Sequence, residues 1–387
     1  MTLLIVSSRY PYPLNKGDKL RMYHQIQDLA REFKIIFISL TDEEVQEDHK
    51  KILEGLCDKL YIFKLNKFAI GLNIIKGLVK GWPVQVSYFF NRSIEKKISE
   101  IIEATKPDHI YVQLIRTTEY VKHLTLPKTL DYMDCFSTNS AKRAETSSGL
   151  IKLFWKWESE KVKEYEAKIF PFFDNHTIIT KVDASQMPAM CSPVTVIPNG
   201  IDTNFLNVSS SQERDIDLLF VGNLSYYSNV DAVHFIVKKI VPYLGKSLKI
   251  VIAGANPSPS LKLLVKENPP IELMPDVVDI KSIYKRSKVF IAPITKGTGM
   301  QNKILEAIAS GCEVICSKEV SDGLGLKLNT VHIALNAAAY ISEIGNLLSH
   351  FSSHSAQREN SRNFLAKEFN WVDKNKLLID IINKHKS

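Results

Sequence analysis

The sequence contains no apolar run that approaches the roughly 18 residues needed to cross a bilayer. Its five cysteines are an odd and scattered set among 387 residues, which predicts reduced thiols rather than a disulfide framework. No basic segment and small-residue cleavage site open the chain, so we expect no signal peptide. Together these absences predict a cytoplasmic protein.

Other absences exclude whole classes of function. Cys312 and Cys316 have no companion cluster of His or Cys, so we expect buried apolar thiols and no metal site. No G-x-G-x-x-G follows the first apolar run, which argues against a dehydrogenase. No Arg-rich helix is present, so we expect no nucleic-acid partner.

The net charge of +8 is spread evenly, with 28 basic and 24 acidic residues through Gly200 and 22 against 18 after it. An even excess favours mild attraction to phosphorylated ligands or anionic membranes. A non-catalytic basic protein that binds polyanions remains an alternative.

Short apolar runs alternate with segments of helical length along the whole chain, which predicts two doubly wound parallel sheets. The expected strands of the first half are 3–8, 34–40, 59–65, 110–115, 129–134 and 176–180. Those of the second half are 217–224, 248–254, 271–277, 289–294 and 312–317. The punctuation Pro198-Asn199-Gly200 places the linker within 194–207, between domains 1–198 and 199–370. In open sheets of this kind, ligands bind at the carboxyl ends of the strands.

The stretch "GTGMQNKILEAIASG", Gly297 to Gly311, joins a predicted strand to a predicted helix through two glycines. Free backbone N–H groups and the helix dipole favour an anion at such a turn. Lys303 and Glu306 are three residues apart and therefore share one helix face. The ammonium suits a diphosphate and the carboxylate suits a ribose diol, although an ordinary surface ion pair behind a turn has the same spacing.

Four segments, in this order, carry a resemblance: "VIPNGID", "LLFVGNL", "IAPITKGTGMQNKILEAIASGCEVICS" and the late "FNW". They resemble the retaining, nucleotide-sugar-dependent glycosyltransferases of family 4, which have the GT-B fold, and in particular those that build bacterial surface polysaccharides. The resemblance implies two Rossmann-like domains that face a central cleft. It also implies that 199–370 binds the donor, that 1–198 binds the acceptor, and that the terminal helix 371–387 packs back on the first domain.

The resemblance further implies an activity: transfer of a hexose or related sugar from a nucleoside diphosphate to a glycan or lipid-linked acceptor, with no metal or other cofactor. A nucleotide-sugar 2-epimerase of the same fold remains an alternative. No general base is assigned, because in a retaining reaction the departing phosphate can take the acceptor's proton.

Carried over by the resemblance, Lys303 faces the phosphates and Glu306 holds the ribose, and these are the candidate catalytic residues. The other donor-binding candidates are Gly222, Asn223, Ser225, Asp276, Val277, Gly297, Thr298, Gly299, Met300 and Gln301. Two departures stand out. Thr298 stands where the family has its first glutamate, so backbone groups of 297–301 are expected to contact the sugar instead. The loop after 217–224 lacks the usual Arg and Lys, so Lys303 or Lys296 must supply the positive charge that binds the diphosphate.

Candidates for the acceptor side or cleft lie in the first half: Gly17, Arg21, Gln113, Arg116, Asp134 and Ser137. Each has a structural alternative. Arg21 also suits a solvated helix position, and Asp134 or Ser137 suits an ordinary helix cap.

Two stretches combine large apolar residues with lysines. Leu65–Phe90 fits a basic amphipathic helix on the inner membrane surface, or equally an irregular insertion packed in the core. In 150–173 the alternating charges favour a solvated helix face. Localisation is therefore expected to be cytoplasmic, with peripheral contact with the inner face of the membrane left open.

Overall fold

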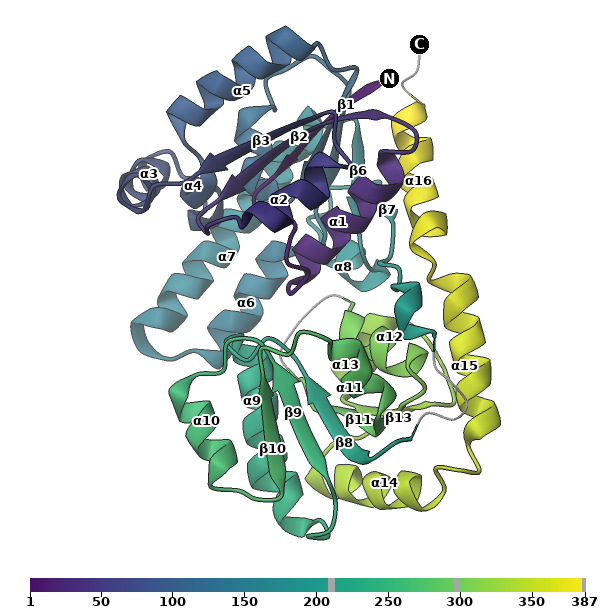
Figure 1. Ribbon diagram of the computed structural model, residues 1–387. Coiled ribbons are helices and arrows are strands. Elements are labelled where there is room, and N and C mark those ends of the chain that lie inside the picture. The colour runs from purple at the N-terminus through teal and green to yellow at the C-terminus, as the bar shows by residue number, and fades with distance from the viewer. Residues whose placement is uncertain (208–212, 296–299, 385–387) are drawn as a thin grey trace. The chain divides into compact units, whose positions relative to one another are not determined.

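The computed structural model describes residues 1–207, 213–295 and 300–384 (Figure 1). Within it the chain divides into two compact units, one of Met1–Pro198 with Val372–Ser387 and one of Asn199–Trp371. Each unit is built on one parallel sheet.

The sheet of the first unit has seven parallel strands in the order β3-β2-β1-β4-β5-β6-β7. These are β1 (Thr2–Ser7), β2 (Lys34–Thr41), β3 (Lys59–Lys64), β4 (His109–Gln113), β5 (Lys128–Asp131), β6 (Asn175–Ile178) and β7 (Thr195–Val196). The order reverses at β1, which lies between β2 and β4. Such a switch point opens a crevice at the carboxyl ends of the strands.

Helices connect these strands and cover the sheet of the first unit. They are α1 (Gly17–Leu29), α2 (Glu47–Glu54), α3 (Lys67–Val79), α4 (Val84–Phe89), α5 (Arg92–Thr105), α6 (Phe136–Thr146), α7 (Gly149–Ile169), α8 (Lys181–Gln186) and α16 (Trp371–Asn383). Short 3-10 turns add η1 (Ile115–Tyr120) and η2 (Phe170–Phe172).

Both faces of the first sheet are buried. Leu4 and Val6 of β1 belong to one apolar cluster, and Leu3 and Ile5 belong to a second. Leu378 of α16 joins the second cluster together with residues of α1, and Asn375 donates to Asp28 Oδ2 at 2.6 Å. Burial on both faces explains why these strands are apolar throughout rather than alternating.

The second unit has six parallel strands in the order β10-β9-β8-β11-β12-β13. They are β8 (Ile216–Val221), β9 (Ile250–Gly254), β10 (Ile271–Pro275), β11 (Ser287–Ala292), β12 (Glu313–Cys316) and β13 (Val331–Ile333). Its helices are α9 (Tyr227–Phe235), α10 (Pro259–Lys266), α11 (Ile280–Lys285), α12 (Asn302–Ala309), α13 (Lys318–Leu324), α14 (Ala337–Ser349) and α15 (Ser355–Glu368). Here the order reverses between β8 and β11, and α12 is the helix that follows β11.

The predicted doubly wound parallel architecture is therefore confirmed, with two strands more than expected. The edge strand β7 lies inside 194–207, which we expected to be linker, and β13 lies in a segment expected to contain no strand. Among the described residues, no helix combines the length and apolar character that a membrane span requires.

Candidate functional site

The amino end of α12 carries the two residues on which the sequence prediction depends. Lys303 and Glu306 lie in its first turns, and both are half-buried. The buried face of α12 explains their position, because Ile304, Leu305 and Ile308 pack into the core of the second unit. The helix therefore holds both polar side chains at the edge of the core, after the strand beside the switch point.

The Lys303 ammonium is held by a side chain from the first turn of α9. Its Nζ donates to Asn229 Oδ1 at 2.6 Å and lies 5.0 Å from the ring centre of Phe220. Asn229 Nδ2 in turn donates to the carbonyl of Asn223 at 2.9 Å, which fixes the amide with its oxygen toward the lysine. Burial lowers the pKa of Lys303 to about 7, against an opposing influence of Glu306. The lysine thus gains full charge most easily when an anion binds.

Glu306 is the acidic partner in this arrangement. Burial raises the pKa of Glu306 to about 7, and the nearby Tyr284 hydroxyl and Lys303 ammonium oppose that rise. Tyr284 is fully buried, and its hydroxyl makes no hydrogen bond of normal geometry within the described part of the chain. The pKa of Tyr284 is raised well above 10, first by burial and then by Glu306. The half-buried Glu306 carboxyl group is therefore the one of the two that a hydroxyl-bearing partner could reach.

The loop after β8 is packed tightly against Lys303's partner. A Cβ at Gly222 would lie 2.8 Å from the side chain of Asn229, and a Cβ at Gly254 would lie 1.7 Å from the Gly222 carbonyl. Glycine is required at both positions for this close approach. Asn223 Oδ1 accepts hydrogen bonds from both the backbone N–H and the hydroxyl of Ser225, which closes the turn.

The loops after β9 and β10 each contain a residue in the left-handed backbone region. Asp276 has φ of +49° and Asn256 has φ of +57°, both in the left-handed region. Asp276 Oδ1 accepts from the Asn256 N–H at 3.0 Å, and so its side chain shapes the loop. Val277 packs against the core of the second unit.

The glycine turn itself is only partly described. Gln301 occupies the N-cap position of α12 without a capping hydrogen bond from its side chain, and Met300 packs against the core. Lys296, Gly297, Thr298 and Gly299 lie outside the described residues.

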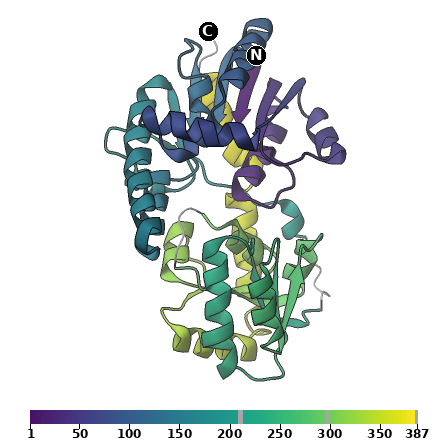
Figure 2. The ribbon, with the colours of Figure 1, turned by 90° about the vertical axis from the view of Figure 1, so that its left-hand side faces the viewer.

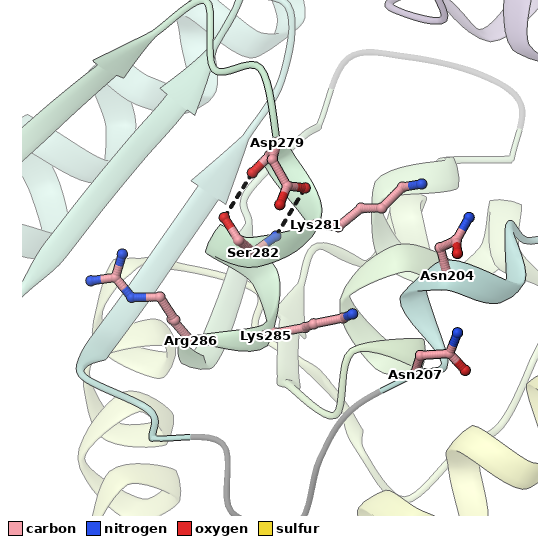
Figure 3. Close-up of a pocket in the computed structure, with 7 residues that line it drawn as sticks. All are labelled: Asn204, Asn207, Asp279, Lys281, Ser282, Lys285 and Arg286. Atoms are coloured by element: carbon pink, nitrogen blue, oxygen red, sulfur yellow. Dashed lines mark hydrogen bonds between the residues drawn. The ribbon is translucent and has the colours of Figure 1, made fainter.

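The same unit contains a surface cavity of about 410 Å³ that none of the predicted donor-binding residues line. Its lining residues are Asn204, Asn207, Asp279, Lys281, Ser282, Lys285 and Arg286 (Figure 3). Lys281 also pairs with Asp202 at 2.7 Å, and both charges influence the pKa of Glu306. The cavity therefore adjoins the Glu306 environment without containing it.

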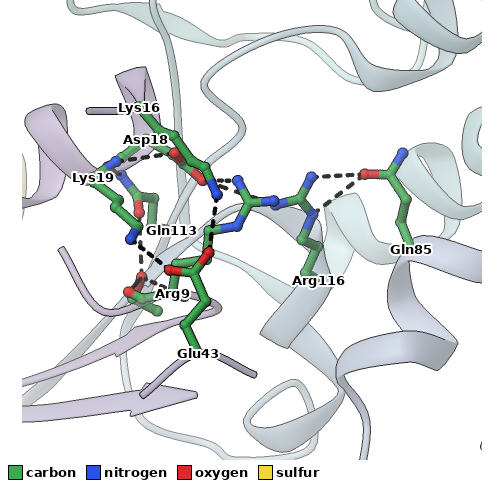
Figure 4. Close-up of polar contacts among 9 residues, drawn as sticks. Arg9, Lys16, Asp18, Lys19, Glu43, Gln85, Gln113 and Arg116 are labelled. Carbon is green, nitrogen blue, oxygen red and sulfur yellow. Dashed lines mark hydrogen bonds and ion pairs between the residues drawn. The ribbon is translucent and has the colours of Figure 1, made fainter. Parts of the chain in front are cut away.

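In the first unit, the carboxyl ends of β1 and β4 form a polar network (Figure 4). Asp18 pairs with Arg9 at 2.6 Å and lies 3.9 Å from Arg116, whose guanidinium also donates to Gln85 Oε1 at 3.0 Å. Gln113 Nε2 donates to the carbonyl of Asp18 at 3.0 Å. Although burial raises the pKa of Asp18, the two arginines produce a net lowering, so this carboxylate stays ionised. Gln113 and Arg116 thus both contact Asp18, and Gln113 is buried and bonded within the protein.

Two of the first-half candidates prove to be structural. Arg21 is fully buried and forms an ion pair of 2.6 Å with Asp131, so it lines no cleft, and the solvated alternative is also wrong. Ser137 is buried and donates to Glu166 Oε2 at 2.6 Å. Glu166 also accepts from the N–H groups of Phe136 and Ser137, so it caps α6 in place of a local side chain.

Gly17 and Asp134 remain accessible. Gly17 is the exposed first residue of α1, and a side chain there would meet open space, so no packing demands glycine. Asp134 is half-buried after β5, and the residue at the N-cap position of α6 is Cys135 rather than Asp134. Burial, followed by the neighbouring carboxyl group of Asp183, raises the pKa of Asp134 to about 8.

Several of these partners carried no sequence signal. Asn229 and Tyr284 are separated from Lys303 and Glu306 by long stretches of chain, and only the fold brings them together. Within the described ranges, no group of three or more His, Cys, Asp or Glu side chains is arranged to hold a metal ion.

Comparison with known proteins adds a family match. Residues 215–350 match the family described as "Glycosyl transferases group 1", a range that includes α12 and the loops around it. A relative from Klebsiella pneumoniae, described as an uncharacterized 44.6 kDa protein in the cps region, is 24% identical over 347 residues, 84% of each chain. The family match supports transferase activity.

Solved structures show the same fold over nearly the whole chain. Anabaena Alr3699/HepE in complex with UDP has a TM-score of 0.71 at 12% identity, and the match covers 99% of this chain and 100% of that one. WaaG, a glycosyltransferase involved in lipopolysaccharide biosynthesis, has a TM-score of 0.66 at 12% identity over 98% and 99% of the two chains. The GT-B fold class predicted from the sequence is thereby confirmed.

Proposed function

We propose that the protein is a retaining glycosyltransferase of family 4 that transfers a sugar from a nucleoside diphosphate to a glycan or lipid-linked acceptor. The observation that carries the proposal is the pairing of a half-buried ammonium and a half-buried carboxyl group on the first turns of α12, inside the segment that matches group 1. The cps-region relative supports a role in surface polysaccharide synthesis.

In the proposed reaction, Lys303 binds the donor diphosphate and stabilises the charge that develops on it as the glycosidic bond breaks. Asn229 keeps the ammonium in place through its 2.6 Å hydrogen bond. Glu306 accepts hydrogen bonds from the ribose hydroxyls, and the departing phosphate takes the acceptor's proton. Because the positive charge is supplied by the lysine and the amino end of α12, the reaction is proposed to need no metal.

The division of labour between the units is part of the same proposal. Asn199–Trp371 binds the donor, and Met1–Pro198 with the terminal helix binds the acceptor. Asp134, Arg116 and Gly17 are the acceptor-side candidates that remain at accessible positions of the first unit. A cytoplasmic enzyme that touches the inner membrane surface through Leu65–Phe90 fits a lipid-linked acceptor.

A thermal-shift panel of UDP, GDP, ADP, CMP and their sugars tests the donor site. One diphosphate is expected to raise the melting temperature of the wild type. Lys303→Ala is expected to abolish most of that shift, and Glu306→Ala to weaken it. Lys262→Ala and Glu267→Ala, on the exposed side of the same unit, are the matched controls and should behave as the wild type.

Equal shifts in the wild type and in both site variants would refute the assignment of Lys303 and Glu306. Product analysis with the nucleotide sugar that gives the largest shift then separates transfer from 2-epimerisation. An epimerase converts the sugar without an acceptor, whereas a transferase requires one.

A further inference from the structure

The helix α3 of the first unit is apolar on two opposite faces. Ile70, Ile74 and Gly77 face inward, where Gly77 approaches α4 so closely that a Cβ there would lie 1.9 Å from Ser87 Oγ. The outward face carries a second stripe at helical spacing, which consists of Phe68, Leu72, Ile75 and Val79. Since one face already packs on the protein, a helix in water would be polar on the other.

This outward stripe is strongly exposed and is flanked by cations. Phe68 is 90% exposed and Val79 is 86% exposed. Lys67 and Lys76 stand at either side of the stripe, and α3 contains no acidic residue. Lysines at the border of an apolar stripe can extend toward anionic headgroups while their methylene chains remain in the apolar layer.

A second exposed apolar surface lies at the amino end of α7. Leu150 is 84% exposed, and Leu153, Phe154 and Trp157 continue its stripe over the first two turns. Further along the same face, the stripe gives way to Lys161, which pairs with Glu164. The change from apolar to charged residues along one helix face indicates that only the first turns are adapted to an apolar environment.

The first turns of α7 are also basic and aromatic. Lys152 and Lys156 lie among the apolar residues, and Arg143 of α6 lies over the ring of Trp155 at 4.6 Å. Trp side chains and lysines together are typical of the interface between water and a bilayer.

The two surfaces belong to the same side of the first unit. In Figure 1, α3 and the connection between α6 and α7 both project to the left of that unit. Figure 2 turns this side toward the viewer and shows α3 lying across it. Both helices therefore lie on one side of the first unit.

We propose that the outer stripe of α3 and the first two turns of α7 together form a two-point docking face for an anionic lipid bilayer. An anionic bilayer fits both parts, since each combines exposed apolar side chains with lysines, and the acid-free α3 has no charge that would repel it. For 150–173, this proposal assigns the first two turns of α7 to the bilayer, where the sequence predicted a solvated helix face. Membrane binding by this face does not depend on whether the protein transfers sugars.

Vesicle co-flotation of the full-length protein tests the face. The probes are vesicles of phosphatidylcholine alone or with about one third phosphatidylglycerol, a proportion in the range of anionic membranes. Wild type is expected to bind the anionic vesicles, less so at high salt, with a blue shift of tryptophan emission. Phe68→Ser/Leu72→Ser and Leu150→Ser/Phe154→Ser are each expected to weaken binding about tenfold or more, since each removes two exposed apolar side chains that enter the bilayer on binding.

The control variant Leu263→Ser/Leu335→Ser removes two exposed apolar residues of the second unit and should bind as the wild type. All variants should keep the nucleotide-induced thermal shift of the wild type, which separates this inference from the donor site. Wild type that ignores anionic vesicles, or double variants that bind them undiminished, would overturn the proposal. So would a wild-type dimer that the α3 and α7 variants convert to monomer, because a second copy would then cover the face.

Discussion

Donor binding should be coupled to protonation of Lys303. The pKa of this lysine is about 7 in the free protein because burial disfavours its charged form. A bound diphosphate favours the ammonium and raises its pKa, so binding takes up a proton whenever the free lysine is neutral. Affinity for the donor should therefore fall as pH rises above 7.

The size of this fall in affinity follows from the pKa of Lys303 in the free protein. If Lys303 is fully charged in the complex, the dissociation constant grows by the ratio of (1 + 10^(pH − 7)) at the two pH values. Between pH 7 and pH 9 this is about 50-fold, or about 2.3 kcal/mol. Glu306, whose pKa is raised to about 7, works in the opposite direction, because in the proposed binding mode its ionised form is the one that accepts hydrogen bonds from the ribose.

Glu306→Gln removes this second titration and isolates the lysine. In that variant, isothermal titration calorimetry with an intact nucleotide sugar, which has no phosphate group that titrates near neutral pH, should show a loss of about 50-fold to 100-fold, about 2.3–2.7 kcal/mol, because removing the Glu306 charge lowers the pKa of Lys303 further. Repeating it in buffers of different ionisation enthalpy should give close to one proton taken up at pH 9. The double variant Lys303→Met/Glu306→Gln should bind the nucleotide sugar weakly, with an affinity that no longer depends on pH. An unchanged dissociation constant in Glu306→Gln from pH 7 to pH 9 would refute the coupling.

Two further substitutions test the scaffold of each unit. Arg21→Met leaves Asp131 buried without its ionic partner, so the free energy of unfolding measured in urea titrations should fall by about 3–5 kcal/mol. The control Arg31→Met changes a mostly exposed arginine and should lower it by less than about 0.5 kcal/mol. Equal losses in the two variants would contradict the role of the buried ion pair. Gly222→Ala places a methyl group 2.8 Å from Asn229 and should displace the amide that holds Lys303. We expect weaker nucleotide binding with a small change in melting temperature, and unchanged binding would show that this contact can relax.

The sequence was a good guide wherever local pattern determines structure. The apolar runs marked the central strands because burial on both faces removes any need for polar residues. The two- and three-residue strands β7 and β13 were missed, since so short a segment has no periodicity to recognise. In 65–90, the pattern fitted either a basic amphipathic helix or an insertion packed in the core, and it did not show that α3 packs one apolar face inward while a second faces outward.

The positions of the candidate site residues were predictable only where the residues lie on the same helix or strand. Lys303 and Glu306 share a helix face, so their spacing alone placed them together. Arg21 and Ser137 were misjudged because their partners, Asp131 and Glu166, lie 110 and 29 residues away. A charged residue on a predicted helix is usually solvated, and only the tertiary fold reveals a buried counter-ion.

The ends of the second unit meet. Ile201 N–H donates to the Phe369 carbonyl at 2.7 Å, and a Cβ at Gly200 would lie 2.6 Å from Trp371. A domain whose first and last residues are in contact can be inserted into another domain at a single position of the chain. Residues 199–371 can therefore be exchanged for a related domain through one pair of adjacent junctions. Such an exchange would change what this unit binds and leave the sheet of the first unit unaltered.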